Sequence, residues 1–163
     1  MRSSGTRSWP ENAALNAVAT LLLEPEIAKR WVPKVLSRTY DQSFQPAALK
    51  KGITIGMGMT EKQGGSDIRA NTTQARPVAQ PGGGNAYLLT GHKWFCSAPM
   101  SDAFLILAQT AKGVSCFLVP RWKPDGSKNT LRIQRLKDKL GNRSNASSEL
   151  EFTDAFGWLV GEE

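Results

Sequence analysis

The chain has 163 residues, of which 40% are hydrophobic and 21% charged, so it can bury a core and wholesale disorder is excluded. No apolar run approaches the ~20 residues of a membrane span, and the two cysteines and one histidine lack zinc-ligand spacing, so neither a membrane segment nor a bound metal is predicted. The formal net charge of +7 favours an anionic partner, such as a nucleotide, nucleic acid or acidic protein surface, or reflects a missing acidic remainder of a larger protein.

The length favours one domain, or one domain plus a piece of another. Both cysteines, Cys96 and Cys116, are expected to be small buried side chains in a reducing compartment, which predicts a cytoplasmic protein. The first residues, "MRSSGTRSW", are rich in Arg and Ser like an organelle transit peptide, but the stretch is too short to carry that assignment.

Residues 11–36 are expected to be helical, because apolar side chains recur there at helical spacing. The first stripe consists of Ala14, Leu15, Val18, Ala19 and Leu22. Pro25 is expected to begin a second helix, because proline is tolerated at the first helical position.

In this second helix Ile27, Trp31 and Val35 would share one face. Pro33 lies inside the run, so the helix is expected to end or kink before it. Two amphipathic helices cannot bury both stripes by themselves. Residues 1–50 are therefore interpreted as the C-terminal remnant of an N-terminal helical domain.

From residue 51 onward, short β-prone runs alternate with turn residues. The runs are "GITIGMGM", "NTTQARPV", "AYLLT", "HKWFCS", "AFLILAQT", "VSCFLVP", "LRIQRL" and "SELEFTD". Many short strands with Gly, Pro and Asn between them predict an all-β barrel or sandwich over residues 51–163. The stretches "PGGGN" and "KPDGSKN" are typical of hairpin loops, because Gly and Asn adopt the positive φ that such turns need.

The stretch "GMGMTEKQGGSD", residues 56–67, has two interpretations. If a helix begins at Gly64, several backbone N–H groups converge into an anion site, with the Thr60 and Ser66 hydroxyls nearby. Otherwise the stretch is a strand followed by a Gly-rich turn, with Asp67 or Ser66 capping "IRAN". The residues by themselves favour the second interpretation.

The stretch "GHKWFCSA", residues 91–98, is also open to two interpretations. Strand alternation would place Trp94 and Cys96 on one face and Phe95 and Ser97 on the other. The strand either contributes one aromatic ring to each layer, or offers an aromatic plane to a flat cofactor with Ser97 donating a hydrogen bond. His92 is expected at the surface or in a turn. Residues 135–152, rich in Lys and Arg, are expected to form a solvated loop, with phosphate contact as the weaker alternative.

Taken in order, "MTEKQGGSD", "GHKWFCS" and "KLGNRSNASSELEFTD" resemble the middle domain of the acyl-CoA dehydrogenases. In that family the first motif usually reads Thr-Glu-Pro-x-x-Gly-Ser-Asp and the second Lys-x-Trp-Ile-Thr/Ser. The resemblance runs from about Trp9 to the C-terminus. "GMGM", the Lys-Gln in place of the usual proline, and "GNRSNAS" resemble the AidB branch, which is linked to the bacterial alkylation-damage response.

The resemblance implies a mainly β fold: a middle-domain β-barrel preceded by a short remnant of an α-helical bundle, with the C-terminal helical domain absent. It also implies FAD as cofactor, acyl-CoA as a further ligand, and a homo-oligomer in the full-length family. The implied cofactor-binding residues are Met57, Met59, Thr60, Gly65, Ser66, Trp94, Phe95, Cys96 and Ser97.

Among these residues, backbone N–H groups near Met59 and Thr60 would bond the pyrimidine edge of the flavin and stabilise the negative charge of its reduced form. Trp94 would pack against the isoalloxazine ring, with Ser97 near the reactive nitrogen. In the family the catalytic carboxylate comes from the C-terminal helical domain. No catalytic residue is therefore assigned in this chain, and Glu61 is not taken as the base.

The resulting hypothesis is a FAD-dependent acyl-CoA dehydrogenase-type oxidoreductase, here a fragment that lacks the base and is inactive by itself. The alternative is a non-catalytic flavin- or DNA-binding module related to the alkylation-damage response. DNA contact in the AidB branch is attributed to the C-terminal region, and the basic residues are scattered among loops, so DNA binding is not expected of this chain. A third interpretation is that the chain is a truncated gene product without a separate role.

Overall fold

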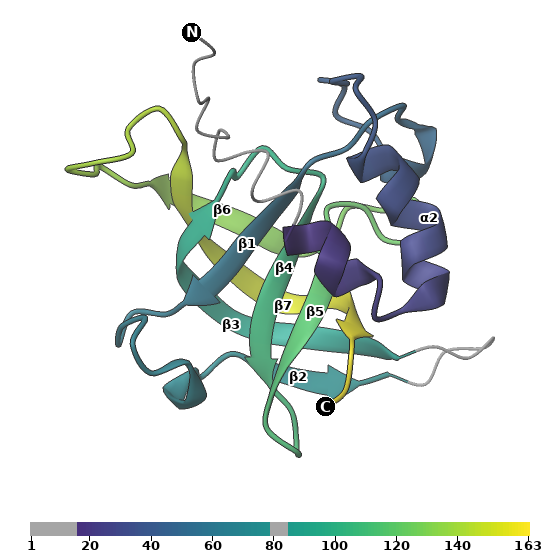
Figure 1. The fold of residues 1–163 in the computed structure, drawn as a ribbon. Helices are drawn as coiled ribbons and strands as arrows, with labels where there is room; N and C mark the ends of the chain where they lie inside the picture. The colour runs from purple at the N-terminus through teal and green to yellow at the C-terminus, as the bar shows by residue number, and fades with distance from the viewer. Residues whose placement is uncertain (1–15, 79–84) are drawn as a thin grey trace, which may run out of the picture.

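A computed structural model describes residues 16–78 and 85–163, and its secondary structure is mainly β (Figure 1). The strands are β1 (Ile55–Thr60), β2 (Gln74–Pro77), β3 (Ala86–Ser97), β4 (Ala103–Gln109), β5 (Val114–Pro120), β6 (Leu131–Leu136) and β7 (Ser147–Val160). The helices are α2 (Pro25–Val35) and the short 3₁₀ turns η1 (Ala47–Leu49) and η2 (Ile68–Ala70).

The strands form one seven-stranded sheet in the order β1-β3-β2-β4-β5-β7-β6, with additional pairings β1–β4 and β3–β7. These additional pairings close a ring in which β1, β3, β7, β5 and β4 each pair with the next strand and β4 returns to β1. The β1–β4 pairing is parallel, while the other pairs of the ring are antiparallel. The mainly β fold predicted from the sequence is confirmed, and the ring corresponds to the predicted barrel.

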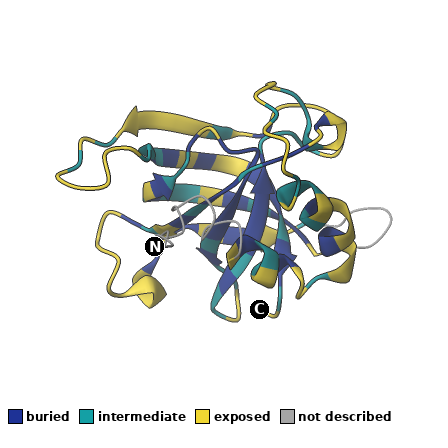
Figure 2. Ribbon diagram, turned by 45° about the horizontal axis from the view of Figure 1, so that its top comes forward, coloured by how far each residue is buried: buried dark blue, intermediate teal, exposed yellow. Residues whose placement is uncertain are grey.

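Apolar side chains from the ring strands fill its interior. Buried core residues include Leu89, Phe104, Phe117, Leu150 and Phe152. Figure 2 shows the buried residues gathered in the central strands and the exposed ones in the loops, along the edge strand β6 and on the outer side of the helix. The continuous apolar runs of β4 and β5 fit this position, since both strands are buried along almost their whole length.

The runs "AYLLT" and "HKWFCS" belong to one strand, β3, and not to two strands as the alternating pattern predicted. Gly91 stands between them with φ +148°, a conformation that favours glycine. A Cβ at Gly91 would lie 2.6 Å from the Cα of Thr73. The glycine therefore serves a close approach between two segments, and the strand continues through it.

Helix α2 begins at Pro25, as predicted, and packs its apolar face against the outside of the strand ring (Figure 1). Ile27 and Trp31 are buried there in a cluster that includes Leu105 and Val160. The apolar face of this helix therefore finds its partner in the sheet. The prediction that α2 ends or kinks before its second proline was wrong in placing the end, because the helix continues to Val35.

Pro33 is accommodated because it lies in the last turn of α2. A proline there removes the donor to the carbonyl of Lys29, and Lys29 is exposed, so water can replace that donor. In the segment before α2, residues 16–21 are helical, but the buried residues are Ala17 and Leu21.

The prediction that the first apolar stripe is the buried face was therefore wrong. Within the described residues, Val18 is partly buried, and Ala19 and Leu22 are exposed. Its members Ala14 and Leu15 lie outside the described residues.

The connection from α2 to β1 is held by a buried ion pair. Lys50 Nζ lies 2.6 Å from Asp102 Oδ1, and the other oxygen of Asp102 accepts a hydrogen bond from Thr54 N at 2.9 Å. Lys34, in the last turn of α2, donates to the backbone carbonyls of Ala47, Ala48 and Lys50. The side chains between the helix and the ring thus connect the two parts by directed polar contacts as well as by apolar packing.

The predicted turn "KPDGSKN" is confirmed as a tight turn, in which Lys123 N donates to Ser127 O and Gly126 has φ +80°. Most of the predicted hairpin loop "PGGGN" lies outside the described residues. Among the described helices, none has the length and apolar character needed to cross a membrane. The part of the chain that the structure describes contains no cluster of His, Cys, Asp or Glu suited to a metal ion.

Candidate functional site

The two motif-bearing stretches lie side by side at one end of the strand ring. Strands β1 and β3 are antiparallel, and their register pairs Gly58 with Cys96 and Thr60 with Phe95. The C-terminal end of β1, which carries Met57, Met59 and Thr60, is thus next to the aromatic pair of β3. The two motifs, more than thirty positions apart in the sequence, form one local surface.

A bulge in β3 decides which way its side chains point. Against β7, Lys93 pairs with Leu150 and Cys96 with Ser148, so three steps along β3 match two along its partner. The extra residue leaves both Lys93 and Cys96 fully buried.

The predicted alternation of Trp94 with Cys96 and of Phe95 with Ser97 is therefore wrong. Trp94 and Phe95 both lie on the outer side of the bulge, where Lys137 Nζ is close to both rings. Cys96 joins the core, and burial raises the pKa of its thiol to about 12. Its side chain is not available to a ligand.

The two outward aromatic rings are not equally accessible. Lys137 Nζ lies 3.1 Å from the ring centroid of Trp94, and Arg135 and Lys62 stand 5.4 and 5.8 Å away. The indole is therefore surrounded by cations of the protein itself. Phe95 is 42% exposed and has Lys137 at 4.9 Å from its ring centroid. Of the two rings, that of Phe95 is the one free to receive a flat ligand.

The Gly-rich loop, defined here as residues 61–73, does not contain the helix start that would form an anion site. The only helical element in it is the three-residue 3₁₀ turn η2, and Asp67 caps this turn by accepting a hydrogen bond from Arg69 N at 3.1 Å. The interpretation as a strand followed by a capped Gly-rich turn is confirmed. Ser66 is exposed near the tip of the loop.

Gly65 packs directly on Thr60. A Cβ at Gly65 would lie 3.0 Å from Thr60 Oγ1, which is tighter than an ordinary contact, so the glycine leaves room beside the hydroxyl. The hydroxyls of Thr72 and Thr73 donate to protein acceptors, whereas that of Thr60 has no such acceptor among the described residues. The Thr60 hydroxyl thus remains available to a ligand.

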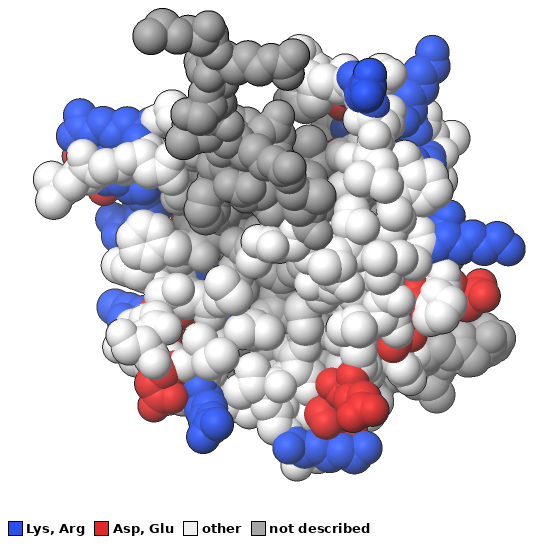
Figure 3. Space-filling view, viewed as in Figure 1, with Lys and Arg blue, Asp and Glu red and all other residues white. Residues whose placement is uncertain are grey.

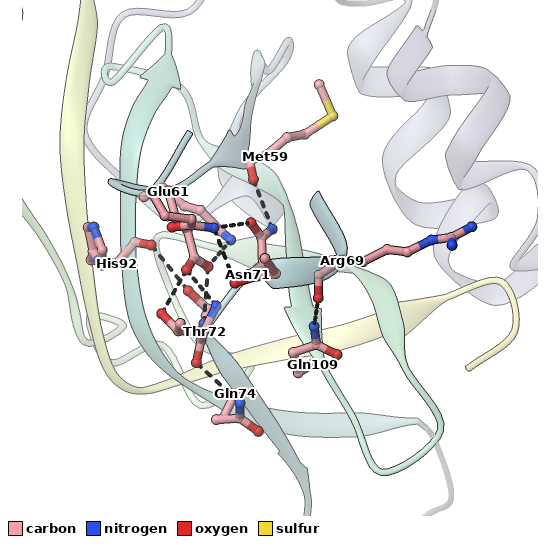
Figure 4. Close-up of polar contacts among 12 residues, drawn as sticks. Met59, Glu61, Arg69, Asn71, Thr72, Gln74, His92 and Gln109 are labelled. Carbon is pink, nitrogen blue, oxygen red and sulfur yellow. Dashed lines mark hydrogen bonds and ion pairs between the residues drawn. The ribbon is translucent and has the colours of Figure 1, made fainter. Parts of the chain in front are cut away.

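Glu61 and Lys93 form an ion pair beneath this surface (Figure 4). The Nζ–Oε1 distance is 2.6 Å, and both side chains have 0% exposure. Glu61 also accepts hydrogen bonds from Thr72 N, Thr72 Oγ1 and Thr73 N. Burial tends to raise the pKa of Glu61, but the hydrogen bonds from Lys93, Thr73 and Thr72 outweigh it and lower the pKa to about 2. The carboxylate is thus ionised at neutral pH, and both its oxygens accept hydrogen bonds.

A cavity of about 440 Å³ lies beside the start of β1 and the end of β3, away from the Thr60 end of β1. Gly56, Met57 and Ser97 contribute to its wall, together with residues 37–41 and 144–146. Met57 and Ser97 were predicted from the motifs, but the segment 37–41 was missed and carries no motif that would have indicated it. None of the other predicted residues lines this cavity. Cys96 lies in the core and Ser66 near the tip of the Gly-rich loop, while Met59, Thr60, Gly65, Trp94 and Phe95 lie at or beside the Phe95 surface.

In residues 135–152 the basic side chains are bonded within the chain. Lys137 and Arg135 both pair with Glu149, and Lys139 donates to Asn145 O and Ser147 Oγ. Glu149 has its pKa lowered, chiefly by the hydrogen bond from Lys137. The stretch consists of the end of β6, a loop and the start of β7, so the expected solvated loop accounts for its middle part.

The profile of the acyl-CoA dehydrogenase middle domain matches residues 56–155, which is more than half of the chain. The chain belongs to the acyl-CoA dehydrogenase family. It is 56% identical over 149 residues to the putative acyl-CoA dehydrogenase AidB of Escherichia coli (strain K12), covering 90% of this chain and 27% of AidB. It is 33% identical over 124 residues to acyl-CoA dehydrogenase family member 11 of Caenorhabditis elegans, covering 69% and 19% of the two chains.

Solved structures of the family share the fold. The Caenorhabditis elegans protein ACDH-11 in complex with C11-CoA matches 99% of this chain and 28% of its own, at 30% identity and a TM-score of 0.77. A glutaryl-CoA dehydrogenase of Mycobacterium smegmatis in complex with FADH2 matches 82% of this chain and 29% of its own, at 25% identity and a TM-score of 0.58. The chain spans less than a third of each of these relatives. The predicted family, its AidB-like branch and the mainly β fold are thereby confirmed.

Proposed function

We propose that this chain provides the flavin-ring site of a FAD-dependent oxidoreductase of the acyl-CoA dehydrogenase type. The observation that carries the proposal is the pairing of Thr60 with Phe95, which places a free hydroxyl and strand-end backbone groups beside an exposed aromatic ring. When bound, FAD would supply the hydride acceptor for α,β-dehydrogenation of an acyl-CoA. FADH2 in a family structure and C11-CoA in another support these two ligands.

The residues divide into two roles. Met59 and Thr60 would donate hydrogen bonds to the pyrimidine edge of the ring, and stabilise the charge that develops there on reduction. Phe95 would receive the flat face of the ring, in place of Trp94, because cations already surround the indole. Met57 and Ser97, at the cavity wall, would contact the ring on the side nearer the cavity.

The described carboxylates near this surface are all engaged. Glu61 is paired with Lys93, and Asp102 with Lys50. Asp41 accepts from Ser43 and from Lys51 N. We therefore infer that the base that removes the α-proton does not come from these groups, and that the isolated chain holds FAD weakly and does not turn over an acyl-CoA.

The DNA-binding alternative receives less support. On the face shown in Figure 3, the visible Lys and Arg side chains lie scattered around the rim. Nucleic-acid platforms gather their positive charge in a patch or stripe instead.

The test is a titration of the 163-residue chain with FAD, followed by flavin fluorescence. We expect measurable, weak binding that Thr60→Val reduces about two- to tenfold, because a hydrogen bond to the uncharged edge of oxidised FAD contributes about 0.5–1.5 kcal/mol. Thr110→Val is the matched control, since its hydroxyl donates to Gly113 O in the β4–β5 turn. Absence of FAD binding at millimolar concentration, or equal effects of the two variants, would contradict the proposed site.

A second measurement addresses the base. Anaerobic addition of acyl-CoAs to the FAD-loaded chain should leave the flavin absorbance unchanged. Bleaching would mean that a base is present among these residues after all.

A further inference from the structure

The geometry points to Glu61 and Lys93 as positioning residues, whose buried ion pair presets the flavin-ring surface. This inference rests on the proposed function, which assigns that surface to Thr60 and Phe95. The pair itself has no contact with solvent and lies beneath the surface, so it would act through its neighbours and not by touching the ring.

Each partner of the pair adjoins a residue of the surface. Glu61 directly follows Thr60 at the end of β1, and Lys93 directly precedes the outward Trp94–Phe95 step of β3. The 2.6 Å contact therefore ties the two strands at the place where both depart from regular pairing. The register between Gly58 and Thr60 is irregular, as is that between Lys93 and Cys96. Where ladder hydrogen bonds are interrupted, another directed interaction is needed to hold the strands in one arrangement.

The same carboxylate closes the Gly-rich loop at its base. Glu61 begins the loop, and its oxygens accept from Thr72 and Thr73 at the other end, at 2.6–3.0 Å. Asn71 adds a second tie by donating to Met59 O at 3.0 Å (Figure 4). The tip of the loop, with Gly65 against the Thr60 hydroxyl, is thereby held over the surface.

A buried ion pair is a poor choice for stability alone. Apolar residues of the same volume often stabilise a core equally well or better, because they need no desolvation. An ion pair differs in having direction: Lys93 and three donors of the loop all converge on one carboxylate. Such convergence holds Thr60 and Phe95 in one relative position, which a preorganised binding surface requires.

The test compares Lys93→Met with Lys50→Met, because both changes remove the lysine from a buried pair with the same 2.6 Å contact. FAD affinity of the 163-residue chain is measured by fluorescence titration at a temperature where each variant is folded. We expect Lys93→Met to weaken FAD binding about tenfold or more, and Lys50→Met to change it less than about twofold. Equal losses in the two variants would overturn the proposal.

The double variant Glu61→Met/Lys93→Met covers the case in which the single variant does not fold. It leaves no buried charge unpaired, although three donors of Thr72 and Thr73 lose their acceptor, so its Tm should lie between those of Lys93→Met and the natural chain. Its FAD affinity should stay reduced about tenfold, and its Thr72 and Thr73 amides should exchange hydrogen faster. Natural FAD affinity in this variant would show that the pair is only structural and would overturn the proposal.

The two proposals fail in different ways. If the natural chain binds no FAD, the proposed function fails. Amide exchange at Thr72 and Thr73 then still shows whether the pair orders the loop, and unchanged exchange in the double variant would overturn the positioning role independently of any flavin.

Discussion

Two buried ion pairs in this chain have the same length but lie in different surroundings. The Glu61–Lys93 pair joins β1 to β3, and both its side chains are 0% exposed. The Lys50–Asp102 pair joins the connection after α2 to the turn before β4, and its side chains are 5% and 10% exposed. Asp102 also borders two cavities, of about 240 and 440 Å³.

The difference lies in what happens when one partner is lost. A carboxylate beside a cavity can recover hydration from water that enters, whereas one sealed among strands cannot. The equal distances therefore do not imply equal importance. The first pair should therefore be the more costly to break.

The largest effect is expected from Lys93→Met, which leaves Glu61 ionised in the core without its cation. Removing one partner of a buried pair costs about 3–5 kcal/mol of unfolding free energy. Lys50→Met should cost less, about 1–3 kcal/mol, because Asp102 keeps the hydrogen bond from Thr54 N and lies beside a cavity. Urea denaturation of both variants measures the difference, and a greater loss for Lys50→Met would refute the comparison.

Acid titration tests the Glu61 side of the first pair. The folded pKa of Glu61 is lowered to about 2 from an ordinary 4.5. The depressed pKa contributes stability that is fully present above about pH 4.5 and is lost as the pH falls toward 2. The full loss is on the order of 3 kcal/mol.

Glu61→Gln is the matching variant for the titration, because its side chain does not titrate. The gap in unfolding free energy between the natural chain and this variant should therefore shrink as the pH falls from 4.5 toward 2. A gap that is constant over this range would mean that Glu61 is not the ionised partner described here.

Gly91→Ala probes the close approach of Thr73 to β3, next to the first pair. Gly91 has φ +148° and would place a Cβ 2.6 Å from Thr73 Cα, whereas Gly113, at φ +140°, has no atom within 4 Å of its would-be Cβ. Gly113→Ala should therefore lower the unfolding free energy by about 1 kcal/mol, through backbone strain alone. Gly91→Ala should lower it by about 1–2 kcal/mol more, because its Cβ also meets Thr73. Equal melting temperatures for the two variants would show that the approach is easily relieved.

The smallest effect is expected from Arg76→Ala. Arg76 pairs with Asp154 at 3.1 Å, but the two side chains are 62% and 54% exposed. Solvent screening limits such pairs to about 0–1 kcal/mol. Arg76→Ala should therefore cost the least unfolding free energy of the ion-pair variants, as urea denaturation would measure. A loss of about 3 kcal/mol or more would show that solvent exposure does not decide how much each pair contributes.

The sequence predicted the strands well where burial controls their pattern. The apolar runs of β4 and β5 indicated buried strands, and Pro25 marked the start of α2. The prediction was wrong where a non-local contact decides. Gly91 looked like the end of a strand, but its conformation serves the approach of Thr73. Pro33 looked like the end of a helix, but its lost hydrogen bond falls in a solvent-accessible last turn.

The site was predictable in part for the same reason. The order of the motifs predicted that the ends of β1 and β3 belong to the site, and the register between the two strands places these ends side by side. The bulge that turns both Trp94 and Phe95 outward depends on the pairing of β3 with β7, which no local pattern reveals. Lys93 pairs with Glu61 across 32 positions, a contact that no local pattern indicated.

We propose that the end of β1 and the bulge of β3 form one flavin-ring surface. Its most direct test is a map of backbone amide NMR shifts of the 163-residue chain on adding lumiflavin, and separately ADP. We expect lumiflavin to shift the amides around Thr60 and Phe95 first, and ADP to leave them largely unchanged. If lumiflavin shifts other strands, or leaves the amides around Thr60 and Phe95 unmoved at millimolar concentration, the claim is wrong.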